Sequence, residues 1–75
     1  MTIVVNPEYE KYYEELMKNP SFYFKLDRYI ESLDIKLLKD KTHNKSFRLS
    51  DKTITIEFGF TISPEKKVII QKISN

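Results

Sequence analysis

Apolar residues recur at helical spacing in the first half of the chain. One stripe consists of Tyr9, Tyr12, Tyr13, Leu16 and Met17. The preceding Asn6-Pro7-Glu8 is typical of a helix start, because Asn accepts from free amides, Pro lacks only an unpaired amide, and Glu complements the positive helix end. A residue before proline is disfavoured in helical geometry, so Asn19-Pro20 predicts the end of this helix.

A second helix is predicted after this proline, with Ser21 as its expected N-cap. Its apolar stripe consists of Phe22, Leu26, Tyr29, Ile30 and Leu33. The apolar residues of segment 35–38 predict a helix tail or a packed connection. The polar run 39–45 predicts a loop, in which His43 is expected to be exposed.

Strands are indicated at both ends of the chain. Thr2–Val5 is short and largely β-branched, which predicts a first strand. Phe47 and Leu49 alternate with polar residues, which predicts a second strand before a tight turn at residues 51–52. The longest alternating run has one predicted buried face, formed by Ile54, Ile56, Phe58, Phe60 and Ile62.

The end of the chain completes the predicted sheet. Gly59, inside the long strand, indicates a bulge or a point of close packing over the backbone. Residues 68–73 predict a last strand, covered on both faces at its start. The order β-α-α-β-β-β predicts a two-layer α+β fold, with both helices on one face of a mostly antiparallel four-stranded sheet. We expect one domain, residues 1–75.

Composition excludes most classical enzyme sites. The chain has one glycine, one histidine and no cysteine, so a glycine-rich phosphate loop, a thiolate metal site and a histidine-based triad are not expected. We expect no catalytic residue, metal or cofactor. No apolar run approaches the roughly 20 residues of a membrane-spanning helix. The N-terminus does not resemble a signal peptide, so a soluble cytoplasmic protein without membrane contact is expected.

Charge is distributed unevenly along the chain. Residues 8–34 carry seven acidic and four basic side chains, whereas residues 36–52 carry six basic and two acidic ones. The basic side chains Lys41, Lys45, Arg48 and Lys52 form a candidate surface for nucleic acid or another anionic partner. Two simpler interpretations stay open: a solvated lysine-rich loop, and Arg48 paired with Glu57 across the hairpin.

Several local patterns resemble the RelE/ParE toxin superfamily. They are Val4-Val5-Asn6-Pro7-Glu8-Tyr9 at the start, Phe47-Arg48-Leu49 before a turn, Ile54–Phe58, and Lys67-Val68-Ile69-Ile70 at the end. The resemblance covers nearly the whole chain. It implies a cytoplasmic toxin-type module that binds RNA or the ribosome, or a cognate antitoxin.

The sequence departs from the pattern of the RNA-cleaving members of that superfamily. Arg48 matches a basic position on the second strand, with Lys45 close by. Thr53 and Thr55 stand where the resemblance implies an arginine, and no residues follow the last strand to supply the remaining catalytic groups. The resemblance therefore implies a shortened, non-cleaving relative; any residual activity would be ribosome-dependent cleavage of mRNA.

An alternative function uses the acidic helices. A small inhibitor or adaptor, encoded by a virus or mobile element, could occlude another protein through Glu10, Glu14 and Glu15. An antitoxin, or a subunit of an oligomer such as a homodimer, is a third possibility. These hypotheses share the predicted fold and differ in the partner.

Overall fold

The computed structural model describes residues 2–38, 41–62 and 64–75. Its elements, in chain order, are β1 (Thr2–Val5), η1 (Pro7–Tyr9), α1 (Glu10–Met17), α2 (Pro20–Glu31), α3 (Ile35–Leu38), β2 (Thr42–Arg48), β3 (Thr53–Thr61) and β4 (Lys67–Ser74). The predicted element order is confirmed, with a short 3-10 turn before the first helix and a third short helix after the second.

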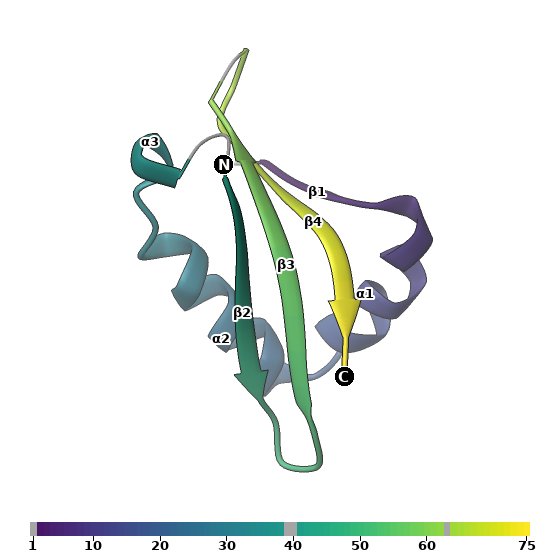
Figure 1. Ribbon diagram of the computed structural model, residues 1–75. Coiled ribbons are helices and arrows are strands. Elements are labelled where there is room, and N and C mark those ends of the chain that lie inside the picture. The colour runs from purple at the N-terminus through teal and green to yellow at the C-terminus, as the bar shows by residue number, and fades with distance from the viewer. Residues whose placement is uncertain (1, 39–40, 63) are drawn as a thin grey trace.

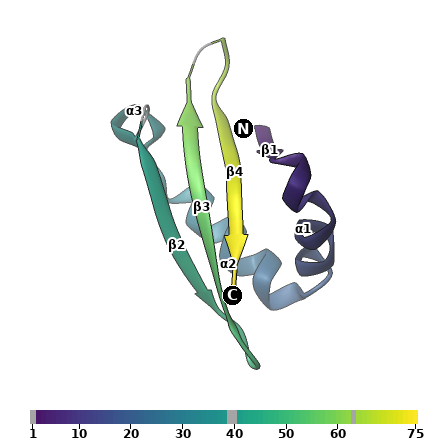
Figure 2. The same ribbon diagram turned by 45° about the vertical axis from the view of Figure 1, so that its right-hand side comes forward.

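The strands form one mixed sheet in the order β1-β4-β3-β2. β2, β3 and β4 pair antiparallel, and β1 pairs parallel with β4. Figure 1 shows α2 behind the β2 side of the sheet and α1 near the β1–β4 side, and Figure 2 shows the same layers from another direction. The predicted two-layer α+β fold is therefore confirmed.

One residue, Asn19, follows the Lys18 C-cap of α1 and caps the start of α2. Its backbone is extended (φ −86°, ψ 112°), as expected before a proline. Its side-chain oxygen accepts hydrogen bonds from the amides of Ser21 (2.9 Å) and Phe22 (3.4 Å). The prediction that Ser21 is the cap was wrong, because Pro20 already occupies the first helical position and Ser21 lies inside the helix.

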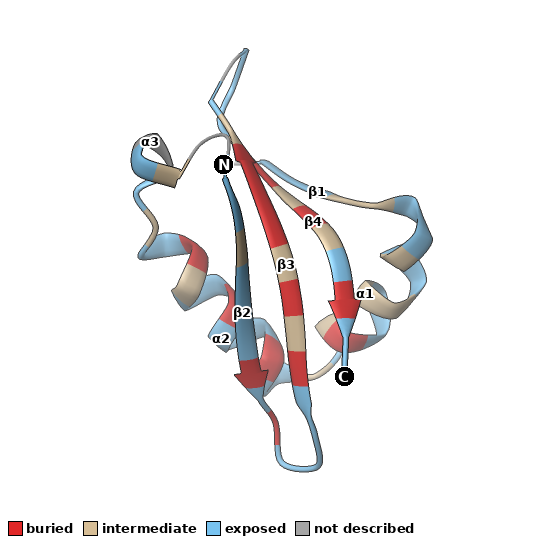
Figure 3. Cartoon of the chain, in the orientation of Figure 1, coloured by how far each residue is buried: buried red, intermediate tan, exposed pale blue. Residues whose placement is uncertain are grey.

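The core lies between the helices and one face of the sheet (Figure 3). Its buried side chains are Leu16, Phe22, Leu26, Ile30, Phe47, Leu49, Ile54, Ile56, Phe58, Phe60, Val68, Ile70 and Ile73. Phe58 is fully buried, and its ring lies 5.3 Å from Tyr29, 6.4 Å from Phe47 and 6.3 Å from Phe60, measured between centroids. Four of the five tyrosines, Tyr9, Tyr12, Tyr13 and Tyr29, lie half-buried at the edge of this core.

The second strand is longer than predicted. It begins at Thr42, so residues 42–45 belong to the sheet and not to the predicted loop, of which residues 39 and 40 lie outside the described part. A polar edge strand lacks the apolar alternation that sequence reasoning relies on. His43 is consequently half-buried in β2, with its ring centroid 5.7 Å from that of Phe60 and its buried Nε2 without a hydrogen-bond partner among the described residues.

Gly59 marks a close approach, as predicted. A Cβ at this position would lie 2.5 Å from the Nε2 atom of Gln71 on β4. The β3–β4 register shifts between Glu57 and Phe58, which leaves Gln71 as an extra residue on β4. The Gln71 side chain then lies over Gly59, on the sheet face that the helices leave open. Ile69 of β4 is only half-buried, so this strand is less covered than expected.

Candidate nucleic-acid interface

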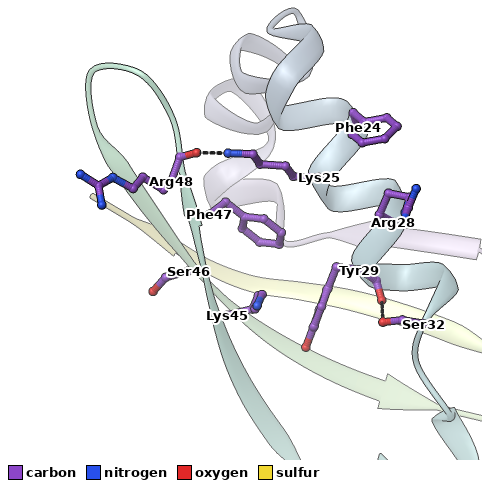
Figure 4. A pocket seen from close by; sticks show the side chains of 9 residues that line it. All are labelled: Phe24, Lys25, Arg28, Tyr29, Ser32, Lys45, Ser46, Phe47 and Arg48. Atoms are coloured by element: carbon purple, nitrogen blue, oxygen red, sulfur yellow. Dashed lines mark hydrogen bonds between the residues drawn. The ribbon is translucent and has the colours of Figure 1, made fainter.

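A groove with cationic walls separates α2 from β2 (Figure 4). We call it the basic groove; its volume is about 590 Å³. Its walls and floor are formed by Phe24, Lys25, Arg28, Tyr29, Ser32, Lys45, Ser46, Phe47 and Arg48. Of these lining residues, four are basic and none is acidic, so the groove suits an anion.

The periods of the helix and the strand bring these side chains together. Phe24, Arg28 and Ser32 are spaced four residues apart and therefore share one flank of α2. On β2, Lys45 and Phe47 point to the helix side because alternate residues of a strand share a face. The rings of Tyr29 and Phe47, 5.8 Å apart and nearly perpendicular, form the floor between helix and strand.

Each groove cation is held against an aromatic ring or the backbone. The Arg28 guanidinium carbon lies 5.5 Å from the centroid of the Phe24 ring, and the Lys45 ammonium lies 5.6 Å from that of Tyr29. The Lys25 ammonium donates to the backbone carbonyl of Arg48. Within the described part of the chain, the ion pairs are Lys18–Glu15 and Lys67–Glu65, so no carboxylate neutralises the groove.

Hydroxyl groups add neutral donors. A phenol with the ordinary pKa near 10 is protonated at neutral pH, and burial raises the pKa of Tyr29 further. The Ser32 hydroxyl donates to the carbonyl of Tyr29 at 2.7 Å. The Ser46 hydroxyl pairs with that of Thr55 at 2.9 Å on the other side of β2. Tyr29 is therefore the groove's neutral donor.

The structure does not bring the four predicted basic residues onto one face. Lys45 faces α2, whereas the guanidinium of Arg48 points away from it (Figure 4), because an odd spacing on a strand places side chains on opposite faces. Lys52 lies in the turn after β2, with its ammonium 5.9 Å from the centroid of the Tyr12 ring on α1. Lys41 is exposed just before β2.

The alternative pairing of Arg48 with Glu57 is not formed. Arg48 lies opposite Thr53 on β3. Glu57 lies opposite Asn44 on β2 and Lys72 on β4. Arg48 is exposed, and its charge remains available beside the groove.

Sequence reasoning missed the helical half of the basic groove. Phe24, Lys25 and Arg28 lie outside the predicted apolar stripe of the second helix, and no role was predicted for them. The fourfold spacing of Phe24, Arg28 and Ser32 was the available signal. The sequence does not say which flank of the helix faces the edge of the sheet. The fourfold spacing therefore indicates a groove only once the strand order is known.

The acidic residues proposed as a protein-contact face lie on the exposed side of α1. Glu10 and Glu14 line a shallow hollow together with Pro7 and Lys11. Glu15 pairs with Lys18 at 3.2 Å, where both side chains are largely exposed. This face is separate from the basic groove.

Other kinds of site were sought across residues 2–38, 41–62 and 64–75. No group of three or more His, Cys, Asp or Glu side chains among them could hold a metal ion. None of the helices described there is long and apolar enough to cross a membrane. A scan of protein-family models, a search of curated proteins and a search of solved structures each find no match to the chain.

Proposed function

We propose that this protein is a small RelE/ParE-like module that binds RNA without cleaving it, through the basic groove. One observation carries the proposal: the groove between α2 and β2 gathers the basic side chains of Lys25, Arg28 and Lys45, and no acidic one, beside an exposed aromatic ring. The sequence resemblance to the toxins is the reason for expecting ribosomal or messenger RNA among possible polyanions.

The side chains suit a single strand of RNA. Arg28 can grip two oxygens of one phosphate, and Lys25 and Lys45 act as point charges on its neighbours. Phe24 is 61% exposed, and its ring offers a base a stacking surface. Phosphate contacts on both walls with one stacked base would bind RNA with little sequence preference.

We expect no cleavage of the bound strand. Thr53 and Thr55 occupy the positions where the resemblance implies a catalytic arginine on β3. The single histidine, His43, has a buried Nε2 and packs against Phe60, so it is poorly placed to donate a proton to a substrate. Incubation with mRNA on translating ribosomes should yield no new cut sites; a specific cut that disappears in Arg28→Ala would contradict this.

The test is a fluorescence titration of a labelled single-stranded RNA at two salt concentrations. Three groove cations predict a slope of about −2 for log K against log salt, at about −0.7 for each neutralised phosphate of a single strand. Lys66→Glu, an exposed charge reversal outside the groove, is the control for net charge. The absence of binding at low salt, or equal losses in Lys25→Glu and Lys66→Glu, would overturn the proposal.

A second candidate function, occlusion of another protein, is favoured by the exposed carboxylates of Glu10 and Glu14 on α1. This function predicts that Glu14→Lys abolishes binding to a basic protein partner and that Lys25→Glu leaves it intact. An antitoxin that competes with RNA for the basic groove would show the reverse pattern. The two charge reversals therefore separate these partners.

A further inference from the structure

A second groove lies on the opposite flank of α2. We call it the acidic groove; its volume is about 340 Å³, at the lower end of the range for binding pockets. Its apolar part is formed by Ile3, Met17, Leu26, Ile30 and Leu33. The remaining lining residues are Tyr23, Asp27 and Glu31. No described lining residue is basic.

The groove exists because the two main helices do not cover the sheet completely. Figure 1 shows α1 and α2 meeting at their shared turn and separating from there. Ile3 of β1 shares the helix-side face of the sheet with Val68 of β4, its register partner. Val68 is fully buried, whereas Ile3 is 38% exposed, so the helix layer ends before it reaches the β1 edge.

The acidic rim has a regular geometry. Tyr23, Asp27 and Glu31 are spaced four residues apart and lie on consecutive turns along one flank of α2. Neither carboxylate takes part in an ion pair within the described part of the chain. Tyr23 is 54% exposed at one end of this row. An apolar strip thus runs beside a line of negative charge.

We propose that the acidic groove binds a basic amphipathic helical segment of a partner protein. The apolar side chains of such a segment, at i, i+3, i+4 and i+7, would fill the space over Leu26 and Ile30. Its Lys or Arg side chains would lie along Asp27 and Glu31. This inference is independent of RNA binding, because the basic groove lies on the other flank of α2.

The charge of the groove distinguishes this occupant from others. RNA and anionic lipid would be repelled by Asp27 and Glu31. A second copy of this chain would have to offer an apolar strip flanked by bases. The exposed surface of α1 carries Glu10, Glu14 and Glu15 beside Lys11 and Lys18, so it offers no apolar strip.

The test uses a synthetic helical peptide of leucine and lysine, with leucines at i, i+3, i+4 and i+7 and lysines along one flank. We expect it to bind the full chain and to shift the methyl NMR signal of Met17, a groove residue. Asp27→Lys combined with Glu31→Lys should weaken binding about tenfold or more, through lost and reversed charge pairs. A peptide of the same composition, with leucines scattered around the helix, should not bind.

A control variant, a further groove variant and a measurement of self-association complete the test. Glu14→Lys reverses one charge on α1 outside the groove and should change peptide affinity less than twofold; an equal loss in Asp27→Lys and Glu14→Lys would overturn the proposal. Tyr23→Ala removes an exposed ring without disturbing the core and should weaken binding severalfold. Concentration-dependent self-association that the Asp27→Lys/Glu31→Lys variant abolishes would instead assign the groove to a second copy.

Discussion

The two flanks of α2 face grooves of opposite charge over one continuous core. Toward β2, the helix presents Phe24, Lys25 and Arg28, and every charged lining residue is basic. Toward β1, it presents Tyr23, Asp27 and Glu31, and every charged lining residue is acidic. One exposed aromatic ring accompanies each set. A single helix therefore offers two chemically distinct surfaces. The small net charge of the chain, +2, does not indicate this separation of basic and acidic side chains.

The difference arises from what lies beside each flank. On the β2 side, a polar edge strand adds Lys45 and the backbone of Arg48. On the β1 side, a short strand and the end of α1 add Ile3 and Met17, which are apolar. The strand β2 thus adds positive charge to the basic flank of α2, whereas β1 and α1 add apolar surface to its acidic flank. Although the two surfaces share one helix, they have no lining side chain in common among the described residues, so binding at one can be altered without changing the other.

Truncation of the shared core should have the largest effect and remove both surfaces together. Phe58 is fully buried against Tyr29, Phe47 and Phe60, so Phe58→Ala should lower the free energy of unfolding by about 3–5 kcal/mol. This is a large share of the stability of so small a domain. Urea denaturation followed by circular dichroism measures it. A loss below about 1 kcal/mol would mean that the ring is not buried in solution.

Charge reversal should separate the two flanks. Lys25→Glu with Arg28→Glu should weaken RNA binding by about 2–3 kcal/mol, because two cationic contacts become repulsive, and leave the leucine–lysine peptide bound. Asp27→Lys with Glu31→Lys is the matched variant and should give the opposite pattern. Titrations of both ligands against both variants check the crossover. Parallel losses of both ligands in either variant would contradict the separation.

Removal of the exposed aromatic rings of Phe24 and Tyr23 should have smaller effects on binding, and these effects should again differ between the two flanks of α2. Phe24→Ala should cost about 1–2 kcal/mol in RNA affinity, from one lost stacking partner, with a change below about 0.5 kcal/mol in unfolding free energy. Tyr23→Ala, on the other flank, should leave RNA affinity unchanged. Fluorescence titration and urea denaturation measure the two quantities. Equal RNA affinities in both variants would exclude stacking on Phe24.

The smallest predicted effect acts on both flanks equally. Asn19→Ala removes the side-chain oxygen that accepts from Ser21 and Phe22, so α2 loses its N-cap at a cost of about 1 kcal/mol in unfolding free energy. Thermal denaturation should show the loss, and the affinities for RNA and peptide should fall together, if at all. Ser21→Ala is the control and should have little effect, since Ser21 makes no cap.

The fold could be predicted from the sequence because, in most of the chain, the spacing of apolar residues and the residues that start or end an element indicate the same helices and strands. The alternation that starts at Ile54 identifies a strand with a single buried face, and Ile54, Ile56, Phe58 and Phe60 are buried. Ile62, predicted to share this face, lies beyond the end of β3 and is 37% exposed, so that part of the prediction was wrong. Pro20 marks the first residue of α2, whereas Asn6 and Pro7 mark the 3-10 turn that precedes α1. The sequence erred where pattern is weak: the polar start of β2 has no alternation to read, and its pairing is set by β3.

The candidate site was less predictable than the fold. Lys45 and Arg48 are close in sequence but lie on opposite sides of β2, because side chains alternate along a strand and β2 includes residue 45, which was predicted to lie in a loop. Lys25 and Arg28 join Lys45 only because β2 is the sheet edge beside α2. The residues that this groove brings together on α2 and β2 are far apart in sequence. A surface built across elements therefore needs the topology before its charges can be grouped.

The parallel pairing of β1 with β4 has a consequence for how the chain folds. Val4 pairs with Ile69 and Val5 with Ile70, so the first strand must wait for the last one. Closing so long a loop should make this domain slower to fold than a helical bundle of equal length. During synthesis, β4 is also the strand that joins β1 to β3. Until residues 67–74 have left the ribosome, the apolar stripes of α1 and α2 have only a partial sheet to cover them, and the nascent chain is then most exposed to aggregation.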